Sequence, residues 1–154
     1  MQHNADVIVV GKGNAALCAA LEARNAGANV IMLEAASEEE SGGNSRFAGG
    51  MMRFTYNGIE DLRTLLEITD EEARNTDWDT NTVDEFYDHL YKVTNYRTDP
   101  RLSELLITRS LESMQWLRKQ GVRFVLNYRA ASAVVDGRRR FFGGMAVEVS
   151  GGGP

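Results

Sequence analysis

The alternation of apolar and polar positions divides the chain into a short α/β unit and a longer, mostly helical stretch. Two continuous apolar runs, Val7–Val10 and residues 29–33, are typical of parallel strands that helices cover on both faces. Between them, strong helix formers with apolar residues at helical spacing predict a helix over residues 15–25. Gly27 stands where a left-handed residue would end that helix. The pattern therefore predicts a strand, a helix and a parallel strand, in that order.

The pattern turns helical and polar beyond residue 50. Amphipathic spacing predicts a helix over residues 59–67, whereas residues 70–82, with five acids and little to bury except Trp78, are expected to form a solvent-facing loop. The segment Thr82–Glu85 matches a capping box and predicts the start of a helix that continues to about residue 95. Its apolar positions are Val83, Phe86, Tyr87, Leu90, Tyr91 and Val93.

A longer helix is predicted from Asp99-Pro100 to Gly121, because proline suits the first helical turn and glycine ends a helix. Its expected core positions share helical spacing and are Leu102, Leu105, Leu106, Arg109, Met114, Trp116 and Leu117. A strand at residues 122–125 follows, and then two strands joined by the turn signal Asp136-Gly137. The fold class predicted is α/β, with a Rossmann-like βαβ unit followed by helices and a small β-hairpin.

The first strand runs directly into a glycine motif of the form G-x-G-x-x-A, which spans residues 11–16. Gly11 can take the tight turn that leaves the strand, and Gly13 has no Cβ to hold a pyrophosphate away from the backbone. Ala16 is small enough for helix and strand to approach closely. The unpaired amides of the first helical turn would then face phosphate groups at the positive end of the helix dipole. The motif indicates a dinucleotide site, and the alternative is a glycine turn in an α/β protein without a ligand.

A carboxylate stands at the end of the second strand. Glu34 follows Gly13 by about 20 positions, the spacing at which an acid accepts hydrogen bonds from an adenosine ribose. A phosphorylated ribose would be repelled there, so the site favours FAD or NAD over NADP.

Composition narrows the function classes. The chain has 154 residues, suits one domain, and has 43% hydrophobic residues and a formal net charge of −5. The acidic balance argues against binding of nucleic acid or of an anionic membrane, and the one basic cluster, Arg138–Arg140, is interpreted as a solvated hairpin. We expect no membrane span and no signal peptide, since the first strand begins soon after Met1.

The cysteine and histidine content predicts neither a disulfide nor a metal site. Cys18 is the sole cysteine and falls within the first helix, so we expect a buried structural thiol and a reducing, cytoplasmic setting. His3 and His89 are the two histidines, far apart in sequence, and no Cys/His cluster has metal-ligand spacing. His3 is expected in a mobile terminus and His89 on a helix surface. No motif for nucleophilic catalysis is present.

A second glycine-rich segment follows the acidic connection at residues 35–41. It reads Gly-Gly-Asn-Ser-Arg-Phe-Ala-Gly-Gly-Met-Met over residues 42–52. Such a backbone can lie close against a large flat ligand, with donors and acceptors beside it. A flavin needs a loop of this kind, whereas a nicotinamide fold usually does not. A flexible linker is the alternative, although arginine, phenylalanine and two methionines would be unusual in one.

The two glycine segments together resemble the N-terminal FAD segment of the fumarate reductase and succinate dehydrogenase flavoprotein superfamily. Within it, G-N-A-A-L-C-A-A, L-E-A-A, G-G-N-S-R and the later G-V-R-F are most similar to the tricarballylate dehydrogenase family. The resemblance is most specific up to Gly50.

The resemblance implies FAD as the cofactor and assigns residues to it. The pyrophosphate would be held by Gly11, Gly13, Asn14, Ala15 and Ala16, and the adenosine ribose by Glu34 with the backbone of Ala35. The second segment would approach the pyrophosphate, the ribityl chain and the flavin ring through Gly43, Asn44, Ser45, Ala48, Gly49 and Gly50. Superfamily members with covalent FAD have a histidine where Asn44 stands. An amide cannot form that linkage, so non-covalent FAD is expected.

The resemblance also implies a flavin-dependent oxidoreductase acting on a di- or tricarboxylate, with tricarballylate to cis-aconitate as the best single interpretation. A fumarate reductase-like or ketosteroid dehydrogenase-like flavoprotein is the alternative among enzymes. An inactive fragment and a small NAD-binding module are the others. Residues 1–154 are expected to be the N-terminal portion of the FAD-binding domain, without the substrate-binding cap and its catalytic arginine and histidine. The implied partners are a small carboxylate substrate and an electron-acceptor protein.

Overall fold

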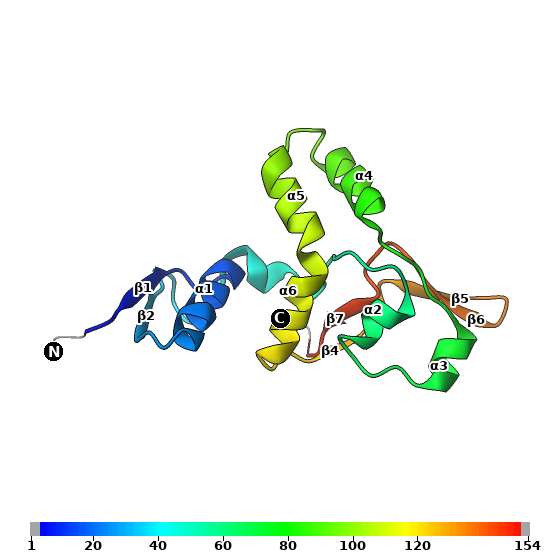
Figure 1. The fold of residues 1–154 in the computed structure, drawn as a ribbon, viewed down its shortest axis with the longest axis horizontal. Coiled ribbons are helices and arrows are strands. Elements are labelled where there is room, and N and C mark those ends of the chain that lie inside the picture. The colour runs from blue at the N-terminus through cyan, green and yellow to red at the C-terminus, as the bar shows by residue number, and fades with distance from the viewer. Residues whose placement is uncertain (1–3, 152–154) are drawn as a thin grey trace. The chain divides into compact units, whose positions relative to one another are not determined.

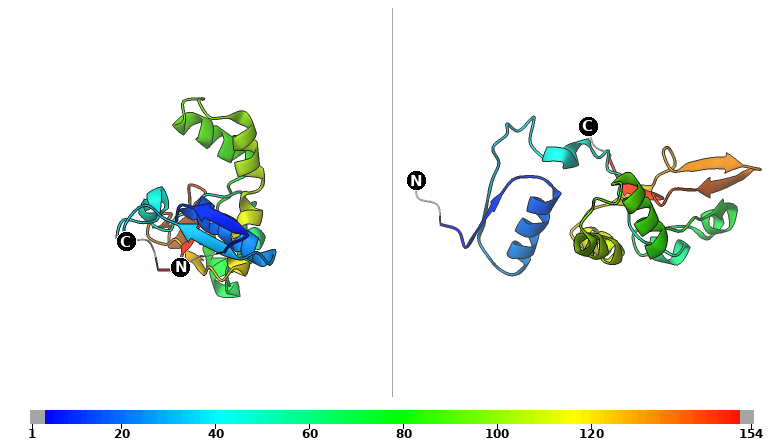
Figure 2. Two further views of the ribbon diagram at one scale, coloured as in Figure 1. Left: turned by 90° about the vertical axis from the view of Figure 1, so that its left-hand side faces the viewer. Right: turned by 90° about the horizontal axis from the view of Figure 1, so that it is seen from above.

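The computed structural model describes residues 4–151, and His3 and the terminal residues 152–154 lie outside the described range. The described chain divides into two compact units, with the boundary between Gly49 and Gly50. Figure 1 labels the elements of both units, and Figure 2 shows the same ribbon from two further sides.

The first unit contains the predicted βαβ arrangement. Strand β1 (Val7–Val10) is followed by helix α1 (Asn14–Asn25) and strand β2 (Val30–Leu33). The strands are parallel and in register from the pair Val7–Val30 to the pair Val10–Leu33. Gly27 has φ of 91°, and its amide donates to the Arg24 carbonyl oxygen at 2.9 Å, so the left-handed helix end is confirmed. The α/β fold class is therefore correct, as is the order of its first elements.

The burial of β1 differs from the prediction that both faces would be covered. Val9 is 8% exposed, whereas Ile8 and Val10 on the opposite face are 61% and 81% exposed. Within residues 4–49, α1 is the one α-helix, and a single helix can cover only one face of a two-stranded sheet. Cys18 lies in α1 as expected but is partly exposed rather than buried.

The second glycine segment forms a short 3₁₀-helix, η1 (Gly43–Phe47), instead of an open loop. Gly42 precedes it with φ of 104°, and Gly49 follows it with φ of 62°. Left-handed backbone at both ends is accessible mainly to glycine, so the glycines of this segment allow the chain to enter and leave the short helix.

The second unit holds the main hydrophobic core. Its helices are α2 (Ile59–Arg63), α3 (Asp70–Asn75), α4 (Val83–Val93), α5 (Pro100–Thr108) and α6 (Ser110–Lys119). Its strands are β3 (Thr76–Asp77), β4 (Phe124–Leu126), β5 (Ser132–Val135), β6 (Arg138–Phe141) and β7 (Val147–Val149). The core cluster consists of Phe54, Tyr56, Leu62, Leu65, Ile68, Met114, Phe124, Leu126, Phe141, Ala146 and Val147.

Two small sheets organise this unit. Strand β6 lies between β3, to which it is parallel, and β5, to which it is antiparallel, while β4 pairs antiparallel with β7. The hairpin from β5 to β6 confirms the turn signal, since Asp136 and Gly137 have φ of 50° and 77°. In Figure 1 this hairpin projects from the unit as two neighbouring arrows. Its cations are paired, because Arg138 and Arg140 both contact Asp77, at 3.0 and 3.4 Å.

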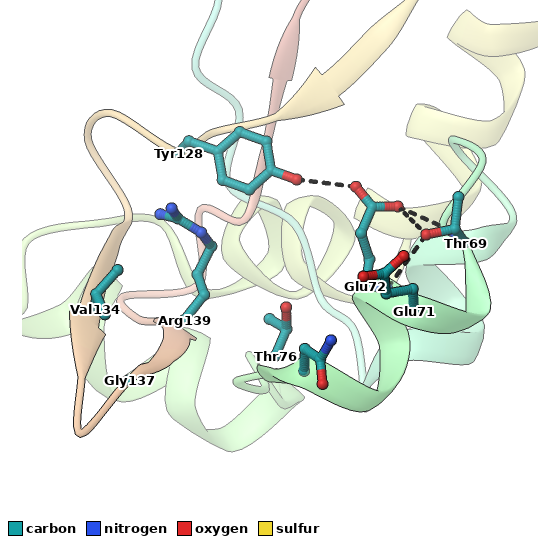
Figure 3. A pocket seen from close by; sticks show the side chains of 9 residues that line it. Thr69, Glu71, Glu72, Thr76, Tyr128, Val134, Gly137 and Arg139 are labelled. Carbon is teal, nitrogen blue, oxygen red and sulfur yellow. Dashed lines mark hydrogen bonds between the residues drawn. The ribbon is translucent and has the colours of Figure 1, made fainter.

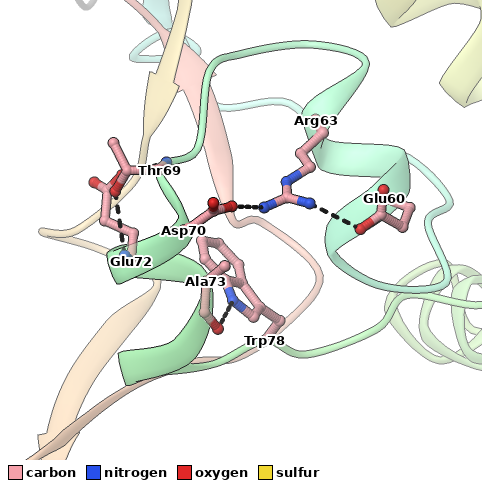
Figure 4. Close-up of polar contacts among 7 residues, drawn as sticks. All are labelled: Glu60, Arg63, Thr69, Asp70, Glu72, Ala73 and Trp78. Carbon is pink, nitrogen blue, oxygen red and sulfur yellow. Dashed lines mark hydrogen bonds and ion pairs between the residues drawn. The ribbon is translucent and has the colours of Figure 1, made fainter.

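The expectation of a loop over residues 70–82 is wrong. Thr69 and Glu72 form a capping box that opens α3, with the Thr69 amide donating to the Glu72 carboxylate at 2.9 Å (Figure 3). Arg63 ties α2 to the start of α3, since its guanidinium contacts Glu60 at 3.1 Å and Asp70 at 3.2 Å (Figure 4). The segment is thus folded onto the core.

The single long helix predicted before Gly121 is divided into α5 and α6 at Arg109, which has φ of −103° and ψ of 3°. The Ser110 hydroxyl donates to the Ile107 carbonyl oxygen at 2.8 Å and accepts the Thr55 amide at 2.8 Å. A serine hydroxyl that bonds to backbone groups in this way competes with the regular helix ladder. The break therefore has a local cause that the apolar spacing did not reveal.

Several predicted core positions are exposed instead. Leu102, Leu105 and Leu106 of α5 are 65%, 61% and 53% exposed, whereas Ile107 and Ser103 are buried. The buried stripe of α5 is therefore a different face from the one that the leucines indicated. Met114 of α6 is buried as predicted. The helix predicted over residues 59–67 ends at Arg63, although Leu62 and Leu65 are in the core.

Candidate functional site

The first glycine motif forms the turn between β1 and α1. Gly11 has φ of 110°, and its amide donates to the Leu33 carbonyl oxygen at 2.7 Å, which continues the strand pairing by one residue. A Cβ at Gly11 would lie 3.7 Å from the Ala16 Cβ, so the turn and the helix are in close contact. Gly13 is the N-cap of α1, with φ of −78° and ψ of 175°. This conformation is open to any residue, so Gly13 is not required by the backbone angles.

The first turn of α1 presents amide groups to the surface. Its N-cap residue, Gly13, has no side chain to cap it, and no acidic residue lies in the turn. The Asn14 amide donates to the Ser45 hydroxyl at 3.0 Å, whereas no hydrogen bond to the amides of Ala15 and Ala16 is found within residues 4–151. These amides lie at the positive end of the helix dipole. The turn is therefore suited to an anion such as a phosphate group.

The second glycine segment lies against this turn, although about 30 residues separate the two in the chain. A Cβ added to Gly13 would meet the Gly42 carbonyl oxygen at 3.5 Å and the Ser45 hydroxyl at 3.6 Å. These are ordinary van der Waals distances, so an alanine would fit there without disturbing the fold. Because Gly13 has no side chain, the space beside its Cα is unfilled, and the Gly42 carbonyl oxygen and the Ser45 hydroxyl border this space.

The carboxylate at the end of β2 lies at the same sheet edge. Because Val10 pairs with Leu33, Gly11 and Glu34 are the next residues on neighbouring strands. The exposed Glu34 carboxylate accepts the Ala36 amide through Oε1 at 3.0 Å. This contact holds the carboxylate close to the strand end. Glu34 and the exposed Ala35 can thus reach a ligand that passes along the edge.

The remaining predicted site residues share fewer contacts with the turn between β1 and α1. Asn44 is exposed in η1, and no hydrogen bond to its side chain is found within the described residues. The Ala48 amide donates to the Ser45 carbonyl oxygen at 3.3 Å. Gly50 belongs to the second unit, where its carbonyl oxygen accepts the Val149 amide at 2.9 Å. The structure therefore brings Gly11, Gly13, Asn14, Glu34 and Ser45 to one region.

Gly42 was not among the predicted site residues. Its carbonyl oxygen is the nearest atom to the open side of Gly13, and its φ of 104° is left-handed. The signal for it was in the sequence, because it is the first of the paired glycines that begin the second segment.

Two of the hollows in the second unit border the β5–β6 hairpin or the turn that follows it. One has a volume of about 340 Å³ and lies between α3 and the β5–β6 hairpin (Figure 3). There the Tyr128 hydroxyl donates to Glu72 at 3.2 Å, and the Arg139 guanidinium lies over the Tyr128 ring at 4.8 Å. Hydrogen bonds from Thr69 lower the pKa of Glu72, and burial raises that of Tyr128. These groups engage one another, which indicates a structural role.

The second hollow has a volume of about 510 Å³ and is lined by residues of three separate segments around Asp79. It contains Arg53 and also His89, which is exposed on α4 as predicted.

Two further features bear on function. Among residues 4–151, no group of three or more His, Cys, Asp or Glu side chains is arranged to hold a metal ion. Within the same range, no helix has the length and apolar character needed to cross a bilayer.

Comparison with known proteins relates this geometry to a family. The sequence profile of the FAD binding domain family matches residues 6–148, which include both glycine segments and Glu34. A probable fumarate reductase from Shewanella frigidimarina is 31% identical over 144 residues, which are 90% of this chain and 21% of that protein. A cytochrome-type fumarate reductase from the same species is 29% identical over 92% of this chain and 22% of its own length.

Another relative has a different named substrate. A vinyl phenol reductase from Lactiplantibacillus plantarum is 30% identical over 77% of this chain and 21% of its own length. The chain thus spans about a fifth of the length of the curated relatives that it matches.

Proposed function

The chain belongs to the family of FAD-binding domains, and from this premise we propose that it is the FAD-binding portion of a flavin-dependent oxidoreductase. The observation that carries the proposal is the contact between the two glycine segments, with Ser45 accepting the Asn14 amide beside the open face of Gly13. A nicotinamide-binding module would have no need of the second segment. The alternative is an inactive fragment, which weak or absent FAD binding would reveal.

The residues present fit the cofactor. In the proposal, Gly11, Gly13, Asn14, Ala15 and Ala16 hold the pyrophosphate, since this turn offers open backbone and two amides without a partner in residues 4–151. Glu34 and the backbone of Ala35 hold the adenosine ribose at the adjoining strand end. Gly43, Asn44, Ser45, Ala48, Gly49 and Gly50 are assigned to the ribityl chain and flavin ring. When bound, FAD supplies the hydride acceptor or donor, and the protein supplies binding and orientation.

The proposed attachment of FAD is non-covalent. Asn44 stands where flavoproteins of the resembling superfamily with covalent FAD carry a histidine, and an amide nitrogen is too weak a nucleophile to form that bond. Acid precipitation of the flavin-loaded protein is expected to leave all flavin in the supernatant. Flavin retained in the washed pellet would refute this part of the proposal.

For the whole protein, we propose a di- or tricarboxylate substrate. Tricarballylate, oxidised to cis-aconitate, is the favoured substrate, on the strength of the segments G-N-A-A-L-C-A-A and G-G-N-S-R. Residues 1–154 are then the N-terminal portion of the FAD-binding domain, in line with the fifth of the relatives' length that the chain spans. An electron-acceptor protein and a cytoplasmic location complete the proposal.

The second candidate is a fumarate reductase-like activity, which the two relatives from Shewanella frigidimarina favour. A ketosteroid dehydrogenase-like activity is a further alternative within the superfamily. Because the substrate-binding residues are expected outside residues 1–154, experiments on the full-length flavoprotein distinguish these activities.

The test is an anaerobic titration of the full-length, FAD-loaded protein. Tricarballylate is expected to bleach the oxidised flavin absorbance, with cis-aconitate formed in equal amount. Bleaching by a 3-ketosteroid but not by tricarballylate would contradict the proposed substrate. If the chemically reduced protein is instead reoxidised by fumarate, and tricarballylate has no effect, the second candidate is correct.

A further inference from the structure

The hollow around Asp79 in the second unit has the properties of a binding site. It has a volume of about 510 Å³ and is bordered by the strand-like segment at Arg53, the start of α4 and the turn after β6. The lining residues used below are Arg53, Trp78, Asp79, Glu85, His89 and Gly144. All of them belong to the second unit, so the site does not depend on how the two units are arranged.

The carboxylates of this hollow are already engaged by protein donors. Asp79 accepts the Tyr56 hydroxyl through Oδ1 and the Gly144 amide through Oδ2, the latter at 3.0 Å. Glu85 accepts the Thr82 amide at 2.7 Å as part of its capping box. Within residues 4–151, neither carboxylate forms an ion pair with the arginine of this hollow, so they compensate its positive charge only in part.

Arg53 is that arginine. Its side chain is partly buried, and within residues 4–151 it forms neither a hydrogen bond nor an ion pair at contact distance. Burial lowers the pKa of Arg53, while the charge of Asp79 acts in the opposite direction. A guanidinium has five N–H donors in a planar fork that matches a carboxylate. Leaving all of them without a protein partner in a concave site is costly unless solvent or a ligand accepts them.

The adjoining wall is flat and apolar. The Trp78 ring stacks on Phe141 with ring centroids 5.3 Å apart and an interplanar angle of 11°. The neighbouring turn contributes Gly143 and Gly144, which have no side chains to fill the space. A Cβ at Gly144 would lie 2.6 Å from the side chain of the buried Asn81, so the turn cannot recede or carry a larger residue. The hollow thus combines one cation with a fixed planar surface.

We propose that this hollow binds a small planar organic anion, with its carboxylate on the Arg53 guanidinium and its flat body along Trp78. His89 borders the entrance and can donate a further hydrogen bond from its imidazole. The site is separate from the two glycine segments, and the inference does not rest on the proposed flavin function.

The experiment uses the full-length protein and benzoate as the probe. Binding is followed through the indole N–H signal of Trp78 in ¹⁵N NMR spectra, assigned with Trp78→Phe, so that benzoate bound elsewhere does not interfere. Benzoate is expected to shift this signal in a saturable way, and sodium chloride should weaken binding because the contact is charge-assisted. Benzyl alcohol, which is flat but neutral, should bind at least about tenfold more weakly, since loss of a charge-assisted hydrogen bond costs about 1.4 kcal/mol or more.

Substitutions of Arg53 test whether its guanidinium binds benzoate. Arg53→Gln is expected to weaken benzoate binding about tenfold or more, and Arg53→Lys should have an intermediate effect because it keeps the charge without the planar fork. Arg97→Gln, which removes an exposed cation outside the hollow, is the matched control and should leave binding unchanged. Thermal melting verifies that each variant is folded.

Two results would overturn the proposal. In one, folded Arg53→Gln binds benzoate as tightly as the parent protein. In the other, inorganic phosphate shifts the Trp78 signal at concentrations as low as benzoate does, which would show a general anion contact without a role for the flat wall.

Discussion

Gly144 and Gly137 both have left-handed backbone, with φ of 66° and 77°, but their surroundings differ. A Cβ at Gly144 would lie 2.6 Å from Asn81, whereas nothing lies within 4 Å of one at Gly137. Gly137→Ala is therefore expected to cost only the backbone term of about 1–2 kcal/mol. Gly144→Ala should lower the free energy of unfolding by about 3 kcal/mol or more, because a steric clash adds to that term.

Chemical denaturation measures this difference between the two variants. Gly144→Ala should lower the free energy of unfolding less when it is introduced into Asn81→Ala than when it is introduced into the parent protein. Equal destabilisation by Gly144→Ala and Gly137→Ala would show that the contact with Asn81 is unimportant.

Tyr56 connects the core to Asp79. Its ring is buried, its hydroxyl donates to Asp79, and burial together with this hydrogen bond raises the pKa of the phenol. The hydroxyl is therefore a donor throughout the usual pH range. Tyr56→Phe should lower the free energy of unfolding by about 1.5–3 kcal/mol, the usual contribution of a hydrogen bond to a carboxylate. Tyr96→Phe, at a position 76% exposed, should change it much less.

At the scale of elements, α3 and α4 share one device. Each begins with a threonine that accepts the amide of a glutamate three residues on, and that glutamate accepts the threonine amide in return. Hydrogen bonds from Thr69 and Thr82 lower the pKa values of Glu72 and Glu85. A lowered folded-state pKa means that the stabilisation is present above the unfolded pKa of about 4.3 and is lost as the pH falls through the folded value.

Glu85→Gln tests this pH dependence. The amide keeps an oxygen that can accept the Thr82 amide but does not titrate, so the variant should be less stable at pH 7 by about 0.5–1 kcal/mol. The difference between parent and variant should shrink when the pH is lowered below 4, since the parent carboxylate is then being protonated. Melting curves between pH 3 and 7 measure it, and a constant difference would contradict the account.

Helix-capping and turn residues, which lie close together in the sequence, predicted the ends of elements correctly. The capping box at Thr82 and the turn at Asp136-Gly137 are both confirmed. The same capping signal at Thr69 was overlooked because five acids in residues 70–82 indicated a solvated loop. The break between α5 and α6 could not be predicted from apolar spacing, because this spacing says nothing about the hydrogen bond from the Ser110 hydroxyl to the Ile107 carbonyl oxygen.

Apolar spacing also misplaced the buried face of α5. Leu102, Leu105 and Leu106 are exposed, while Ile107 and Ser103 are buried. A leucine-rich helix has more apolar residues than one face can accommodate, so tertiary packing decides which are covered. Within the candidate site, the structure places Asn14 in contact with Ser45, and the assignment of these residues to FAD stays a prediction. The contact of Gly42 with the space beside Gly13 could not be predicted from the sequence, because it depends on how the second glycine segment folds.

At the scale of the whole molecule, the two units differ in how much apolar surface they bury. Among the described residues of the first unit, the buried hydrophobic side chains are Val9 and Ala20, whereas the second unit has a cluster of eleven. Two-stranded sheets with little covering are marginally stable. We therefore expect amides of β1 and β2 to exchange with solvent faster than those of β4 and β7.

Hydrogen exchange with mass spectrometry tests this expectation on the full-length protein with and without FAD. Because most of the residues assigned to FAD lie in the first unit, FAD should slow exchange in residues 7–34 and leave β4 nearly unchanged. FAD-induced protection confined to the second unit would contradict the placement of the cofactor at the glycine segments.

Since the pyrophosphate of FAD is proposed to lie against Gly13, a side chain at this position should interfere with FAD binding, and Gly13→Ala tests this proposal. Its φ of −78° and ψ of 175° suit alanine, and the new Cβ would meet its neighbours at 3.5 and 3.6 Å, so the fold should be undisturbed. The measurement is the FAD dissociation constant of the full-length apoprotein, from flavin fluorescence, beside its melting temperature without FAD. We expect FAD to bind about tenfold or more weakly at an unchanged melting temperature. Unchanged FAD affinity in the folded variant would contradict the proposal.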